Sequence, residues 1–113
     1  MKYVVDIDGT ICTLPMICEG ETDYSLAKPI PHRIAEINRL FDVGHHITFF
    51  TARGMGRHNN DAVAVILEFF ELTKGQLTLW GAKHHELIMG KPSGDVYIDD
   101  KAVNDKDFFH EKS

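Results

Sequence analysis

The chain has 113 residues, enough for one compact domain, and its 43% hydrophobic and 26% charged residues are typical of a globular protein. With 12 basic and 17 acidic residues the formal net charge is −5, so the composition gives no indication of binding to nucleic acid. No apolar run is long enough to cross a bilayer and the first residues do not resemble a signal peptide, so we expect a cytoplasmic protein without a membrane partner.

The first half of the chain predicts a strand, a loop, a helix and a second strand. Residues 2–7 form a nearly continuous apolar run, which is typical of a strand buried on both faces. Residues 13–28 have no sustained period and are predicted as a flap with room for a small hairpin. A helix is expected between Pro29 and Gly44, and a second strand over residues 46–50.

The second half predicts two helices and two short strands. A loop over residues 53–60 ends in good N-cap residues, and an apolar helix follows over residues 62–72. A capping-box pattern then predicts a further helix that ends near Trp80. Residues 86–89 and 96–98 are expected to be strands.

This alternation of strands and helices predicts an α/β fold with a central parallel sheet covered by helices on both faces. In such sheets ligands bind beyond the carboxyl ends of the strands. Each predicted strand ends in polar residues, which should therefore meet at one edge: Asp6, Asp8, Thr51, Lys91, Asp99 and Asp100.

Carboxylates gathered at one edge would repel one another unless a cation lies between them. Oxygen ligands from carboxylates, water and a substrate phosphate are the usual environment of Mg²⁺. Asp6 and Asp8 are two residues apart on an extended strand and so point the same way. One carboxylate can attack phosphorus and the other can transfer a proton, while Lys91 and Thr51 contact the phosphoryl oxygens.

Four segments resemble, in order and role, the four motifs of the haloacid dehalogenase superfamily. They are Asp6-Ile7-Asp8-Gly9-Thr10, Phe50-Thr51-Ala52-Arg53, Gly90-Lys91-Pro92 and Tyr97-Ile98-Asp99-Asp100. The resemblance implies a three-layer Rossmann-like fold and an Mg²⁺-dependent phosphohydrolase that forms an aspartyl-phosphate intermediate.

The resemblance also implies a role for each matching residue. Asp6 would be the nucleophile and a metal ligand, and Asp8 the acid and base, with its backbone carbonyl on the metal. Thr51 and Lys91 would hold the phosphoryl group. Asp100 is favoured as the direct metal ligand with Asp99 in support, and the choice between these two stays open.

The gaps between the motifs are too short for the cap domains usual in the superfamily. We therefore expect one capless domain over residues 1–113, with a flap at about residues 13–28. The chain is most similar to small stand-alone members, some linked to surface-sugar biosynthesis, which implies a small phosphorylated metabolite such as a sugar phosphate as the substrate. Without a cap, an open site could also admit a nucleotide or a phosphorylated macromolecule, and the oligomeric state, including a homo-oligomer, stays open.

Substrate contacts are expected from the residues that follow the first two strands. Gly9 permits a sharp turn that leaves room for phosphate near the backbone amides of Gly9 and Thr10. Ala52 and Arg53 follow the second strand, and Arg53, Arg57 and His58 either contact the distal part of the substrate or form a solvated basic loop. The histidine pairs have no assigned role.

Several other functions use similar residues. A dehalogenase needs neither Mg²⁺ nor the second aspartate, and a phosphomutase normally needs a cap. A nucleotidase differs only in substrate. A receiver domain would be a binding and switching module and not an enzyme. It carries its acid pair after the first strand, which is the reverse of the order here. A catalytically idle relative would not need all four motifs.

Overall fold

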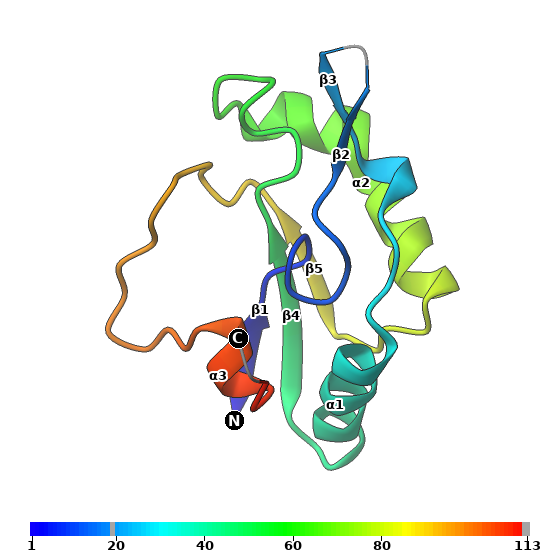
Figure 1. The fold of residues 1–113 in the computed structure, drawn as a ribbon, viewed down its shortest axis with the longest axis vertical. Helices are drawn as coiled ribbons and strands as arrows, with labels where there is room; N and C mark the ends of the chain where they lie inside the picture. Colours follow the sequence, from blue (N-terminus) through cyan, green and yellow to red (C-terminus); the bar gives the residue numbers. More distant parts are fainter. Residues whose placement is uncertain (19, 112–113) are drawn as a thin grey trace.

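Three parallel strands form the central sheet of the protein, for which a computed structural model describes residues 1–18 and 20–111 (Figure 1). The strands are β1 (Lys2–Val5), β4 (His46–Thr51) and β5 (Glu86–Met89), in the spatial order β1-β4-β5. Both neighbouring pairs are parallel. The predicted α/β fold with a parallel sheet is therefore confirmed.

Two long helices pack on one face of this sheet. In α1 (Pro31–Asp42) the first residue is a proline, which suits the first helical position, and Ile34, Ile37 and Leu40 recur on the buried face. In α2 (Ala62–Leu79) the Asp61 carboxylate caps the helix by accepting hydrogen bonds from the amides of residues 63 and 64. Apolar side chains of both helices share one buried cluster with those of β1 and β4.

The opposite face of the sheet is partly open. Val4 is 67% exposed and Ile88 is 44% exposed, and both alternate away from the helical face. The three-layer arrangement predicted from the sequence is thus not seen among the described residues. The reason is that residues 90–104, which follow β5, form an irregular segment and supply no helix for this face.

A hairpin lies between the first strand and α1. Strands β2 (Met16–Cys18) and β3 (Glu21–Asp23) pair antiparallel, and the short 3₁₀ helix η1 (Tyr24–Leu26) follows them. The predicted flap at residues 13–28 thus contains an ordered hairpin. In Figure 1 it projects beyond the carboxyl ends of the strands, on the side of α2.

Two sequence-based predictions about secondary structure are wrong. Residues 62–79 form one continuous helix and not two, because Thr73 and Gln76 turn their side chains inward and do not cap a new helix. Residues 96–98 form no strand. A four-residue helix, α3 (Asp105–Phe108), follows and lies beside the start of β1, where the ring of Phe108 contacts that of Tyr3.

Within the described part of the chain, no helix has both the length and the apolar character needed to span a membrane.

Candidate active site

The turn after β1 places the two aspartates of the first motif. Gly9 adopts φ +81°, which an L side chain rarely adopts, and a Cβ atom there would lie 2.9 Å from Leu14 Cδ2. The Gly9 amide donates to the Cys12 carbonyl at 2.9 Å, and the Thr10 amide donates to the Ile7 carbonyl at 3.0 Å. Both amides are used inside the turn in this conformation, and contact of Gly9 and Thr10 with phosphate stays a prediction.

Asp6, which follows β1, lies beside Lys91, which follows β5 at the other edge of the sheet. Its Oδ1 atom is 3.6 Å from Lys91 Nζ, and its Oδ2 atom accepts a hydrogen bond from the Thr10 hydroxyl at 3.4 Å. Burial raises the pKa of the Asp6 carboxyl above its ordinary value of 3.8, and the Lys91 ammonium offsets part of that rise. Asp6 is thus a half-buried acid that faces a single cation.

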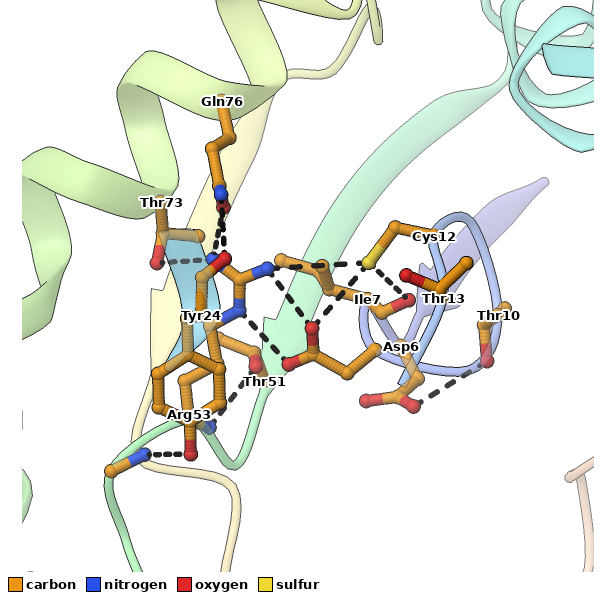
Figure 2. Close-up of polar contacts among 12 residues, drawn as sticks. Asp6, Ile7, Thr10, Cys12, Thr13, Tyr24, Thr51, Arg53, Thr73 and Gln76 are labelled. Atoms are coloured by element: carbon orange, nitrogen blue, oxygen red, sulfur yellow. Dashed lines mark hydrogen bonds and ion pairs between the residues drawn. The ribbon is translucent and has the colours of Figure 1, made fainter. Parts of the chain in front are cut away.

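Asp8 has a different environment although it is only two residues away. Its Oδ2 accepts from Arg53 Nε at 2.9 Å and its Oδ1 from Arg53 Nη2 at 2.9 Å, so the guanidinium holds the carboxylate with two parallel bonds (Figure 2). The Cys12 thiol lies 3.4 Å from Oδ1, and burial raises the pKa of that thiol to about 12, so it remains a neutral neighbour.

Arg53 does not reach toward a substrate. Only 1% of the residue is exposed, and its guanidinium is occupied by Asp8 and by Thr73 and Gln76 of α2. In this conformation the Arg53 side chain is directed into the protein, and its contact with a substrate stays a prediction. A signal for this arrangement exists in the sequence, since Thr73 and Gln76 are polar residues on the otherwise apolar inner face of a helix.

Thr51 ends β4 at the same edge as Asp6. Its hydroxyl accepts a hydrogen bond from the Arg53 amide at 3.1 Å, which leaves the hydroxyl hydrogen as a donor, although the residue is only 1% exposed. Its carbonyl accepts from the Lys91 amide at 3.1 Å, which fixes the backbone of the lysine to the strand end. Ala52 is half-buried and packs against a second buried cluster, which is formed by Met55, Val65, Phe69 and Met89.

The acid pair at residues 99 and 100 does not join this group. Both residues are exposed in the segment after β5, and the Asp99 carboxylate accepts from the Lys101 amide at 2.8 Å, which lowers the pKa of Asp99. The segment closes on itself instead: the Tyr97 hydroxyl donates to the Pro92 carbonyl at 2.7 Å and the Tyr97 ring lies 4.1 Å from Lys91 Nζ. In this conformation Asp99 and Asp100 lie apart from Asp6 and Asp8, and the convergence of the four carboxylates stays a prediction.

The acids described above are the Mg²⁺ ligands expected from the sequence. Among residues 1–18 and 20–111, no group of three or more His, Cys, Asp and Glu side chains lies together in a way that could hold a metal. At the strand ends, the Asp8 carboxylate is committed to Arg53 and Asp6 faces Lys91. In this arrangement neither Asp99 nor Asp100 joins Asp6, and the Mg²⁺ ligand set expected from the sequence stays a prediction.

The remaining basic residues near the site have structural partners. Arg57 and His58 both pair with Glu68 of α2, and Arg57 also donates to the Thr22 carbonyl of the hairpin at 2.9 Å. The histidine rings of His46 and His85 stack with centroids 4.5 Å apart in the region where β4 begins, away from the strand ends that carry Asp6.

No protein-family model and no curated protein matches the chain. A search of solved structures finds a crystal structure of a target protein from Vibrio cholerae, with a TM-score of 0.83 and 25% sequence identity. The similarity covers 98% of this chain and 89% of that one. The Vibrio cholerae protein therefore has a similar α/β fold, and its name gives no activity.

Proposed function

We propose that the chain is a phosphatase of the haloacid dehalogenase type, which hydrolyses phosphoric monoesters through an aspartyl-phosphate on Asp6. The observation that carries the proposal is the position of Asp6, half-buried at a strand end with the Lys91 ammonium 3.6 Å from its Oδ1. An acid next to a fixed cation at the carboxyl edge of a parallel sheet suits attack on a dianionic phosphoryl group.

The proposed reaction has two steps. An Asp6 carboxylate oxygen attacks phosphorus and the ester P–O bond breaks, while Asp8 gives a proton to the leaving oxygen. In the second step Asp8 takes a proton from water, which attacks the acyl phosphate and releases inorganic phosphate. Lys91 stabilises charge on the phosphoryl oxygens in both steps, and the Thr51 hydroxyl hydrogen supports the same oxygens if the strand end opens to admit them.

Mg²⁺ belongs to the proposal on chemical grounds, since a phosphoryl dianion beside two carboxylates needs more positive charge than one lysine carries. In the described conformation the ligands are not assembled, and no step is assigned to the ion. Metal dependence is therefore a separate arm of the experiment.

We further propose a small phosphorylated metabolite, such as a sugar phosphate, as the substrate. Support comes from the resemblance to small stand-alone members of the superfamily, while a hairpin of two three-residue strands forms no separate cap that would exclude a larger substrate. The same reasoning leaves nucleotides in the set of compounds to be assayed.

The test is phosphate release from a panel of sugar phosphates, nucleotides and other phosphomonoesters, with Mg²⁺ and with a chelator. Asp6→Asn is the test variant, and Asp95→Asn, a change at an exposed acid of the segment after β5, is the matched control. We expect release by the wild type and Asp95→Asn and at least a hundredfold loss in Asp6→Asn, in line with removal of a nucleophile. Equal release by wild type and Asp6→Asn from every compound would refute the catalytic assignment, and full activity in chelator would refute the role of Mg²⁺.

A further inference from the structure

The buried guanidinium of Arg53, a residue that follows β4, connects the turn after β1 with helix α2. Two of its donors bind the carboxylate of Asp8, and a third, Nη1, donates to Thr73 Oγ1 at 3.2 Å and to Gln76 Oε1 (Figure 2). None of its side-chain surface is exposed. A buried charge of this kind is tolerated only where its hydrogen bonds are satisfied, and here each side of the guanidinium has a partner.

Tyr24, the first residue of η1 after the hairpin, closes the other side of this network. The ring of Tyr24 covers the guanidinium at 5.1 Å from ring centroid to Cζ, and its hydroxyl accepts from the Gly54 amide at 2.9 Å. The Gln76 side-chain amide donates to the Tyr24 carbonyl at 2.8 Å. Helix α2 and Tyr24 of η1 therefore fix the position of the guanidinium, and the guanidinium fixes Asp8.

We propose that Arg53 is a positioning residue that sets the orientation of the Asp8 carboxylate for proton transfer, with Thr73 and Gln76 as its anchors. Because Arg53 is buried, it acts through Asp8 and does not touch the substrate. Two parallel bonds from a planar guanidinium define the plane of a carboxylate, which a lysine ammonium does not do. Proton transfer requires that plane, since donor and acceptor must approach to about 3 Å along a lone pair.

The anchors provide the sharpest variants, because they leave the Asp8–Arg53 pair in place. Thr73→Val and Gln76→Met remove the hydrogen bonds at the far side of the guanidinium while keeping similar side-chain volume. Thr78→Val is the matched control, since Thr78 is an exposed residue of the same helix whose hydroxyl bonds only its own helical turn at Lys74. Arg53→Lys retains the charge and loses the planar fork.

This inference rests on the proposed phosphatase function, and its kinetic test uses the best substrate of the panel. We expect Thr73→Val and Gln76→Met to lower kcat about three- to tenfold and Arg53→Lys about ten- to a hundredfold, with KM unchanged, because misplacement of a catalytic group by about 1 Å costs up to about a hundredfold. Thr78→Val should match the wild type. Rates are expressed per folded molecule, with the folded fraction taken from near-UV circular dichroism.

Three kinetic results would overturn the inference. One is an unchanged kcat per folded molecule in all the network variants, which would mean that Arg53 only stabilises the fold. The second is a rise in KM at constant kcat, which would mean that Arg53 acts on substrate binding. The third is an equal loss in Thr78→Val, which would mean that any change in α2 has the same effect.

An NMR measurement separates this inference from the proposed function. The Nε–Hε signal of Arg53 should be a distinct, slowly exchanging resonance in the wild type, and should move or broaden in Asp8→Asn and, to a lesser extent, in Thr73→Val. If no phosphoester is hydrolysed but the resonance responds in this way, the phosphatase proposal fails while the network that holds Asp8 is supported. A resonance that is indifferent to Asp8→Asn would overturn the inference whatever the activity.

Discussion

Replacing Asp6 by asparagine should make the metal-free protein more stable. The pKa of Asp6 is raised in the folded state, chiefly by burial, so the folded protein binds the proton more tightly than the unfolded chain does. The stability contributed by this group is therefore fully present below the unfolded pKa of 3.8 and is lost as the pH rises through the folded pKa. At pH 7 the wild type carries this cost, and Asp6→Asn does not.

The expected gain is modest. The Asp6 side chain is still 35% exposed, so solvent screens its interactions, and we expect a gain below about 1 kcal/mol, the range found for exposed charged groups. Asp8→Asn should have the opposite sign, because it removes the partner of a buried arginine, and should cost about 2–4 kcal/mol.

Urea unfolding of wild type, Asp6→Asn and Asp8→Asn in chelator, at pH 7 and pH 4, measures both effects. The difference between wild type and Asp6→Asn should shrink as the pH falls from 7 to 4, because the raised pKa makes the folded protein take up the proton before the unfolded chain does. The reasoning fails if Asp6→Asn is less stable than wild type at pH 7, or if the two aspartate variants change stability in the same direction.

Other changes have outcomes that follow from single contacts. Hydrogen bonds from Arg33 lower the pKa of Glu111 to about 2, so its contribution is present above pH 4.5 and is lost as the pH falls toward 2; Glu111→Gln should flatten the fall in Tm below pH 4.5. Gly54→Ala should cost about 1–3 kcal/mol in urea unfolding, because φ is +75° and the new Cβ would lie 2.5 Å from Phe69 Cδ2. Asp100→Asn, in an exposed segment, should change the free energy of unfolding by less than about 0.5 kcal/mol.

The sheet, and the edge that carries the candidate site, could be predicted from the sequence because they depend on local sequence pattern. Apolar runs over residues 2–7 and 46–50 specify strands, and the rule that ligands bind at the carboxyl ends of parallel strands brought Asp6 and Lys91 to the same place. The structure places their charged atoms 3.6 Å apart, although Asp6 and Lys91 are 85 residues apart in the chain.

The role of Arg53 could not be read in the same way. An arginine just past a strand end can point outward to a ligand or inward to the core, and a single sequence does not distinguish these directions. What decides it is the pair of polar residues on the inner face of α2, Thr73 and Gln76, and that pair also fits the pattern of a helix start.

The missing strand at residues 96–98 has a local cause. Three residues with strand propensity form a weak edge strand at best, and other contacts compete with it. Here the Tyr97 hydroxyl donates a hydrogen bond to the Pro92 carbonyl, and the Tyr97 ring makes a cation–π contact with Lys91. These contacts hold the segment in a loop, and Ile98 is 95% exposed. Pattern alone does not report such a contact between a tyrosine and the backbone five residues before it.

Trapping the covalent intermediate tests the central claim most directly. The protein is mixed with its best phosphomonoester, quenched during turnover and reduced with borohydride, which converts an aspartyl phosphate to homoserine, and the residue is located by peptide mass spectrometry. The account predicts homoserine at position 6 and nowhere else, and none in a reaction without substrate. Turnover with no modification at Asp6, or with modification at Asp8 instead, would contradict it.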